Sequence, residues 1–282
     1  MRIPTYAVAV VRTCTVTPRM RRVTVGGAGL EGFASRGLPD ERIKLLLSRP
    51  GQRRPVLPAI DENGYHYPRG APRPLSRTFT VRRFDPDALE LDIDVALHDG
   101  PAAAWSLDAR EGDAVGIAGP TGGYEPAARP GRHLLAGDEA ALPAMATILE
   151  RLPAGARAEV LVEVADASAE LVVDSRADTR VTWLRRNGGG APVGGLLVQA
   201  MLDFDWPRSP IHVWAAGEAL AMRAIRRHVR DDLRLPRDRY QVVGYWRDRL
   251  NEDQAIEAHL DAQRAAREAG ASDHQIDDAG LY

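Results

Sequence analysis

Hydrophobic and polar residues alternate through the first half of the chain in the pattern of short β-strands. In the stretch Leu89–Leu97, L-D-I-D-V-A-L places apolar side chains at nearly every second position. Successive side chains of a strand point to opposite faces, so this alternation predicts a half-buried strand. Similar apolar or β-branched runs lie at 6–17, 21–25, 43–47, 77–84 and 115–118. Many short strands divided by Gly and Pro turns favour an antiparallel barrel or sandwich.

The second half of the chain changes to strands that alternate with helices. Short apolar runs predict strands at 133–136, 160–165, 181–184, 211–216 and 240–245. Apolar residues at helical spacing predict helices at 142–152, 196–202 and 218–233. This order favours βαβ units around a mostly parallel sheet.

The change of pattern predicts two domains with a break at a proline- and glycine-rich stretch near residues 125–131. We expect a β-barrel domain over 1–128 and an α/β domain with a parallel sheet over 129–250. From residue 251 the chain is polar with scattered alanines, which predicts a helical extension over 251–282. The segment 50–74, rich in Pro, Gly and Arg, is expected to be a long loop.

Composition narrows the classes of function. The 282 residues are 27% charged and 44% hydrophobic, as in a folded protein of about two domains. A net charge of −2 argues against a general nucleic-acid or membrane-surface binder. One cysteine, Cys14, excludes an internal disulfide framework, and seven histidines without metal-ligand spacing argue against a metal held by the protein. With neither a signal-like nor a membrane-length apolar run, we expect a cytoplasmic protein.

A glycine pattern near the N-terminus imitates a dinucleotide-binding fingerprint. Gly27, Gly29 and Gly32 fit G-x-G-x-x-G after a predicted strand. That fingerprint must open a helix whose N-terminus holds a pyrophosphate. Gly37 and Pro39 follow too soon to leave room for such a helix. We interpret the glycines as a turn between strands.

Two other segments carry groups suited to a diphosphate attached to a flat ring. In R-T-F-T, Arg77 offers a guanidinium fork that engages phosphate bidentately, and alternation puts Arg77 and Phe79 on one face with Thr78 and Thr80 on the other. In H-D-G-P-A-A-A-W, from His98 to Trp105, Gly-Pro before small residues predicts a helix start whose backbone N–H groups can receive a phosphate.

Together these motifs resemble the siderophore-interacting proteins, the FAD-binding ferric-siderophore reductases of the ferredoxin-reductase superfamily. R-T-F-T-V-R resembles the family's R-x-Y-T-x-R flavin motif, and H-D-G-P-A-A-A-W resembles its phosphate motif. The family pattern continues in R-I-K-L-L-L at 42–47, G-D-E-A-A-L-P-A at 137–144, A-A-G-E at 215–218 and G-Y-W-R at 244–247. The resemblance extends to about residue 247 and implies a flavin-binding barrel followed by an NAD(P)H-binding α/β domain.

The resemblance also implies roles for individual residues. Arg77 would contact the FAD diphosphate, Phe79 would pack on the flavin, and Thr80 would hydrogen-bond near its reactive nitrogen. The remaining expected FAD contacts are Thr78, His98, Gly100, Pro101, Ala102, Ala103 and Ala104. The expected nicotinamide-cofactor contacts are Asp138, Glu139, Gly217 and Glu218, with Arg185 or Arg186 as a receiver of a 2′-phosphate.

Two residues depart from the family pattern. Phe79 replaces the usual tyrosine, which keeps the stacking surface and removes one hydroxyl hydrogen bond worth about 0.5–1.5 kcal/mol. Ala103 and Ala104 lack the hydroxyl that many relatives place there, so the backbone must bind the phosphate at these positions.

The implied activity is reduction of a ferric siderophore by NADPH or NADH through FAD, which converts a two-electron donor into one-electron steps. No side chain need act as acid, base or metal ligand. Lys44, the only lysine, and Arg247 are candidate contacts for an anionic ferric complex. We expect a monomer.

Two alternative functions remain. One is a general NAD(P)H–flavin or quinone reductase on the same fold, and the other is a siderophore-binding module without redox function. DNA binding by the arginine-rich helix is disfavoured by its apolar stripe.

Overall fold

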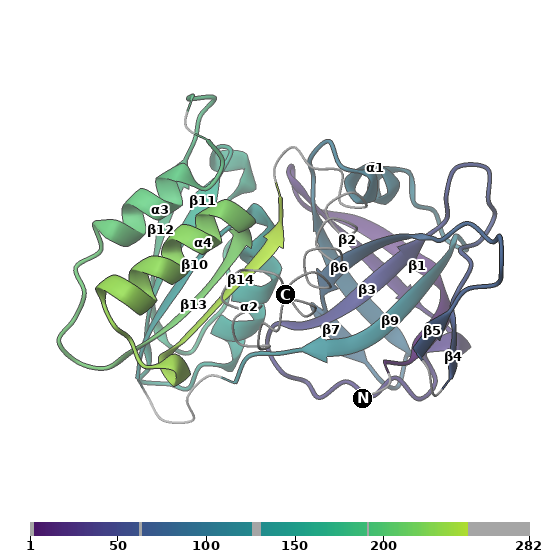
Figure 1. Cartoon of the computed structure of the whole chain (residues 1–282), viewed down its shortest axis with the longest axis horizontal. Helices are drawn as coiled ribbons and strands as arrows, with labels where there is room; N and C mark the ends of the chain where they lie inside the picture. Colours follow the sequence, from purple (N-terminus) through teal and green to yellow (C-terminus); the bar gives the residue numbers. More distant parts are fainter. Residues whose placement is uncertain (1–2, 62–63, 126–130, 191, 248–282) are drawn as a thin grey trace, which may run out of the picture.

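The first half of the chain forms one antiparallel sheet that curls into a barrel, as Figure 1 shows. The computed structural model describes residues 3–61, 64–125, 131–190 and 192–247. The sheet has the strand order β6-β3-β9-β1-β2-β8-β7. Its strands are β1 (Thr5–Thr17), β2 (Met20–Gly26), β3 (Glu41–Leu47), β6 (Leu75–Thr80), β7 (Arg83–Asp85), β8 (Glu90–Ala96) and β9 (Ala114–Gly122). The expected antiparallel barrel is confirmed.

A change of hydrogen-bond partner divides the single strand expected at 77–84. The N–H of Val81 donates to the carbonyl of Glu41 on β3, and the N–H of Arg82 donates to the carbonyl of Asp92 on β8. The chain therefore passes directly from one edge of the sheet, at β6, to the other edge, at β7. This crossing brings the two edges together around a core that includes Val25, Ile43, Leu45 and Ile93.

Three short elements complete the barrel domain. The segment expected to be a loop at 50–74 contains a hairpin of β4 (Ala59–Asp61) and β5 (Gly64–His66). A 3₁₀ turn, η1 (Ala28–Leu30), follows β2, where Gly27 has φ 101°. A Cβ on Gly29 would meet the carbonyl oxygen of Ala7, so these glycines form a tight turn. The expected helix after Gly100 is α1 (Pro101–Asp108), which lies over one end of the barrel in Figure 1.

The second half forms a parallel five-stranded sheet in the order β12-β11-β10-β13-β14. Its strands are β10 (Arg132–Asp138), β11 (Arg157–Val164), β12 (Asp178–Arg185), β13 (Ile211–Glu218) and β14 (Tyr240–Trp246). Its helices are α2 (Leu142–Arg151), α3 (Gly195–Leu202) and α4 (Ala219–Arg227), with a π-helical turn at His228–Asp232 and 3₁₀ turns η2 (Glu139–Ala141), η3 (Ala167–Ala169) and η5 (Arg237–Arg239). The expected parallel α/β sheet is confirmed.

Helices cover both faces of this sheet because the buried strands are apolar on both sides. Leu135, Val162 and Trp214 pack with α2, whereas their neighbours Leu134 and Val213 pack with α3 and α4. The apolar stripe of the arginine-rich helix, Met222, Ile225 and Val229, is buried against the sheet. Strand order reverses between β10 and β13, which is where open α/β sheets bind ligands.

Direct contacts join the two halves. Met20 of β2 is buried in the same apolar cluster as α2. Arg82 makes two hydrogen bonds to the carboxylate of Glu150 on α2, and the N–H of Asp40 donates to Thr147 Oγ1 over 3.1 Å. The expected boundary at 128/129 and the expected extension at 251–282 lie outside the described residues. Within the described residues, no helix has the length and apolar character to cross a membrane.

Candidate functional site

Arg77 and the start of α1 meet at one end of the barrel. The Arg77 guanidinium is buried and donates to the carbonyl of Ser76. His98 lies near this guanidinium: burial lowers the pKa of His98, the neighbouring Asp99 opposes the shift, and the Arg77 charge adds to it. A Cβ on Gly100 would lie 2.2 Å from His98 Cε1, so the imidazole packs directly on the glycine backbone. A guanidinium, an imidazole and a helix start are thus adjacent.

The N-terminus of α1 offers backbone donors rather than side-chain ones. Gly100 is the N-cap with Pro101 next to it, and no side chain among the described residues caps this end. Ala102 and Ala103 are buried, so the first turn presents only small groups. Unsatisfied N–H groups at a helix start favour a bound anion. Together with Arg77, this donor set fits the diphosphate of FAD.

The register of β6 against β3 places the four residues of R-T-F-T. Arg77 pairs with Leu45 and Phe79 pairs with Ile43, so both lie on the face that packs on the barrel core. Thr78 pairs with Lys44 and is exposed, as Lys44 is. The alternation expected from the sequence is therefore present in the structure. It puts Lys44 beside the strand that carries Arg77 and Thr80.

Thr80 is buried at the boundary with the second domain. Near it lies the hydroxyl of Tyr245 on β14, whose pKa burial raises well above its ordinary value, while Thr80 opposes the shift. The Tyr245 hydroxyl donates to Asp40 Oδ1. The sequence motifs identified neither Asp40 nor Tyr245 as a site residue, because the two are 205 positions apart and meet only in the fold.

The carboxyl ends of β10 and β13 form the opposite wall of the site. Asp138 is buried, and its carboxylate accepts hydrogen bonds from the N–H groups of Ala140 and Glu218 and from the indole of Trp246. Burial raises the pKa of Asp138 to about 6, although these donors oppose the shift. Gly217 has φ 152°, and a Cβ there would lie 2.5 Å from Asp138 Oδ2. Three of the four expected nicotinamide-site residues, Asp138, Gly217 and Glu218, are thus in contact.

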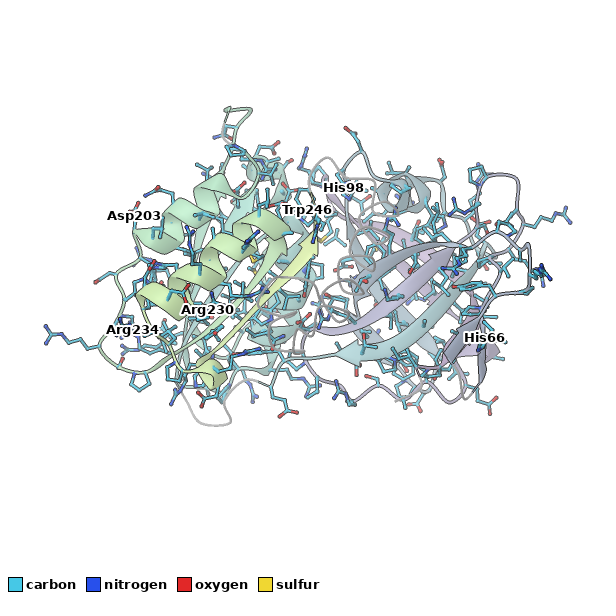
Figure 2. All side chains as sticks on the ribbon, in the orientation of Figure 1. His66, His98, Asp203, Arg230, Arg234 and Trp246 are labelled. Atoms are coloured by element: carbon cyan, nitrogen blue, oxygen red, sulfur yellow. The ribbon has the colours of Figure 1, made fainter. Side chains whose placement is uncertain are left out.

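Glu139, the fourth, connects several charged groups at this edge. Its carboxylate accepts from the N–H of Ala165 and lies 3.5 Å from Arg19 of the barrel and 3.6 Å from Arg186. It also raises the pKa of His98, in opposition to the dominant effect of burial. Charged groups at the barrel end that carries His98 therefore interact with charged groups at the carboxyl edge of the parallel sheet. Figure 2 places His98 and Trp246 where the two halves of the molecule meet.

Arg186 and Arg185 both have carboxylate partners. The Arg186 guanidinium lies 3.0 Å from the fully buried carboxylate of Glu163, which also accepts from the N–H groups of Gly194 and Leu197 at the start of α3. Arg185 pairs with Glu170. A 2′-phosphate at Arg186 would have to compete with two carboxylates. Arg247, at the end of β14, is exposed.

Comparisons with known proteins agree with this arrangement. Residues 9–124 match the model of the siderophore-interacting FAD-binding domain, and residues 130–249 match that of the siderophore-interacting protein. A ferric vibriobactin reductase of Vibrio cholerae is 31% identical over 86% of this chain and 89% of its own. The chain belongs to the siderophore-interacting protein family. Its barrel is accordingly an FAD-binding domain, as the sequence motifs indicated.

Two further relatives extend the comparison. An NADPH-dependent ferric-chelate reductase of Escherichia coli is 29% identical over 84% of this chain and 91% of its own. The crystal structure of a siderophore utilization protein from T. fusca superposes with a TM-score of 0.80 at 35% identity, over 89% of this chain and 95% of that one. Both the barrel and the parallel sheet of this chain thus have counterparts in the family.

Proposed function

We propose that this siderophore-interacting protein reduces ferric siderophores through FAD, with NADPH or NADH as the electron donor. The observation that carries the proposal is the proximity of the two half-sites: Glu139, directly after β10, lies 3.5 Å from Arg19 of the barrel and acts electrostatically on His98 beside the start of α1. A cofactor held by the first half and a second one held by the second half would meet near Thr80. The names of the Vibrio and Escherichia relatives support the reaction class.

The chain's own residues would hold the FAD as follows. Arg77 and the backbone N–H groups of Gly100, Ala102 and Ala103 would bind the diphosphate, with His98 packed on Gly100 beside them. Pro101 has no N–H, and the N–H of Ala104 donates to the carbonyl of Gly100, so Ala104 would contribute only its small side chain. Phe79 would support the ring, and Thr80 would contact its reactive edge. FAD supplies the step from a two-electron donor to one-electron transfer. Asp138, Glu139, Gly217 and Glu218 would line the place of the nicotinamide cofactor, in line with the ligand position of open α/β sheets.

Lys44 is the proposed anchor for the ferric complex. It is exposed, lies opposite Thr78 in the β3–β6 pair, and is two residues from the register position of Thr80. A positive charge beside the flavin edge favours approach of an anionic complex. Arg247 at the exposed end of β14 is the second proposed contact. Electron transfer requires proximity to the flavin and no ligand bond from the protein to iron.

An anaerobic experiment tests the proposal. The bound flavin is reduced with NADPH or NADH, a ferric siderophore is added, and reoxidation is followed by flavin absorbance. We expect Lys44→Ala to weaken the apparent affinity for an anionic siderophore about tenfold without loss of FAD, whereas Arg223→Ala, an exposed cation on α4, leaves it unchanged. Faster turnover of quinones or free flavin than of any ferric siderophore would instead indicate a general flavin reductase.

A further inference from the structure

Arg19 lies in the turn between β1 and β2, where the barrel approaches the second domain. Its N–H donates to Thr17 Oγ1 over 3.2 Å, and its carbonyl accepts from the N–H of Leu97, the residue before His98. The next residue, Met20, is buried in the apolar cluster that contains α2. The backbone of Arg19 is therefore anchored to the barrel on one side and to the second domain on the other.

The side chain of Arg19 reaches the carboxyl edge of the parallel sheet and has no close partner there. Its Nε lies 3.5 Å from Glu139 Oε2, which is longer than the roughly 2.7–2.9 Å of a charge-assisted hydrogen bond. This Nε is buried, and no described residue accepts a hydrogen bond from it. The side chain as a whole is 38% exposed, so an anion from solvent can reach the guanidinium.

The edge beside Arg19 is rich in carboxylates, which oppose the binding of a dinucleotide. Asp138, Glu163 and Glu218 are buried there, and Glu139 lies directly after β10. The diphosphate of a nicotinamide dinucleotide is itself an anion, so the site needs cations that outweigh the repulsion from these acids.

The two arginines of the second domain at this edge already have short contacts with carboxylates. Arg186 Nη1 lies 3.0 Å from the buried carboxylate of Glu163, and Arg185 pairs with Glu170. Arg19 differs because its contact with a carboxylate is long. A guanidinium fork can hold a phosphate group through two parallel hydrogen bonds. The barrel therefore supplies the guanidinium at this edge that can exchange its partner at the lowest cost.

We propose that Arg19 binds the diphosphate of the nicotinamide cofactor, so that both domains hold this cofactor. The guanidinium would exchange its long contact with Glu139 for hydrogen bonds to phosphate oxygens. Since the backbone of Arg19 is bonded to Leu97, this contact would hold the cofactor beside the half-site that carries His98. This inference rests on the proposed function, because it requires a nicotinamide dinucleotide at the carboxyl ends of β10 and β13.

Equilibrium binding to the FAD-loaded protein tests the inference without turnover. Isothermal titration calorimetry with NAD⁺, NADP⁺ and 2′-AMP separates the diphosphate from the 2′-phosphate, because 2′-AMP carries only the latter. We expect Arg19→Gln to weaken both dinucleotides by the same factor, about tenfold, and to leave 2′-AMP unchanged. Arg19→Lys keeps the charge without the fork, so we expect a smaller loss of about threefold. Arg12→Gln removes the same charge from an exposed position of β1, where Arg12 pairs with Glu90, and should match the wild type.

The possible results separate this inference from the proposed function. Equal dinucleotide affinities in Arg19→Gln and the wild type would overturn the inference alone. A loss confined to NADP⁺ and 2′-AMP would assign Arg19 to the 2′-phosphate, and a loss of FAD affinity would assign it to the flavin site; both results contradict the proposed contact. A wild type that binds neither dinucleotide would overturn the inference together with the proposed electron donor. Reoxidation of the dithionite-reduced protein by a ferric siderophore would still support ferric-siderophore reduction in that case.

Discussion

Trp246 donates its indole N–H to Asp138 Oδ2 over 2.8 Å, and this contact joins the last strand of the sheet to its first. The backbone N–H of Glu218 donates to the same oxygen over 2.9 Å. One buried carboxylate thus holds the ends of β10, β13 and β14 together at the edge that faces the barrel. The acidic residue of G-D-E-A-A-L-P-A therefore has a structural role that is independent of any ligand.

The titration of Asp138 predicts a pH dependence of stability. Burial raises its pKa to about 6, whereas an aspartate in an unfolded chain titrates near pH ~3.9. Between these values the folded state binds more protons than the unfolded state, so the free energy of unfolding falls as the pH rises. We expect the difference in unfolding free energy between wild type and Asp138→Asn to fall by up to about 3 kcal/mol across this window, and to stay constant above pH ~7. Urea unfolding of the apoprotein at several pH values measures it. A difference that does not vary with pH would contradict the assignment.

Gly217 and Gly244, which are partners in the β13–β14 register, predict opposite responses to the same substitution. A Cβ on Gly217 would meet Asp138 Oδ2 at 2.5 Å, and φ is 152° there. A Cβ on Gly244 would meet Ala219 at an ordinary 3.4 Å. We expect Gly217→Ala to lower the free energy of unfolding by about 2–4 kcal/mol and Gly244→Ala to change it by less than about 1 kcal/mol. Thermal and urea unfolding of the two variants make the comparison, and similar losses would disprove it.

The ion pairs of Arg186 predict its effect on cofactor choice. Its guanidinium already pairs with Glu163 and lies near Glu139. We expect Arg186→Gln to change kcat/KM for NADPH and NADH by the same factor, because the arginine orients Glu163 rather than a 2′-phosphate. Arg180→Gln, at an exposed position near the start of the same strand β12, is the matched control. A loss confined to NADPH in Arg186→Gln would restore the role that the sequence suggested.

The sequence predicted the elements well where the pattern is local. Alternation and helical spacing located the long strands and helices, because burial of one or both faces determines the residue type at each position. It failed at Val81–Arg82, where the chain changes partner strand, and in the 50–74 segment, where the hairpin strands are only three residues long. Both features depend on which strands come to lie nearby in the fold.

The candidate site likewise contains residues that local motifs reveal and residues that only the fold brings together. Arg77, His98 and Asp138 stand in contiguous motifs, and the structure brings the regions around them together. Asp40 was missed because nothing beside it in the sequence distinguishes it. Its polar partners Trp214, Gln241 and Tyr245 follow more than 170 positions later. From the sequence alone, an isolated acidic residue before an apolar strand is interpreted as a turn residue, because its partners are not yet known.

Arg77 predicts a specific loss of cofactor affinity. A guanidinium fork can make two charge-assisted hydrogen bonds to a diphosphate, whereas an ammonium group acts as a point charge. We expect Arg77→Lys to weaken FAD binding about ten- to a hundredfold, which corresponds to the loss of roughly 1.5–3 kcal/mol from one charge-assisted bond. Titration of the apoprotein by flavin fluorescence quenching measures the change. Arg83→Lys, at the exposed first position of β7, is the control and should bind FAD as the wild type does. Equal FAD affinity in Arg77→Lys and wild type would remove Arg77 from the diphosphate site and leave the α1 start as its main anion donor.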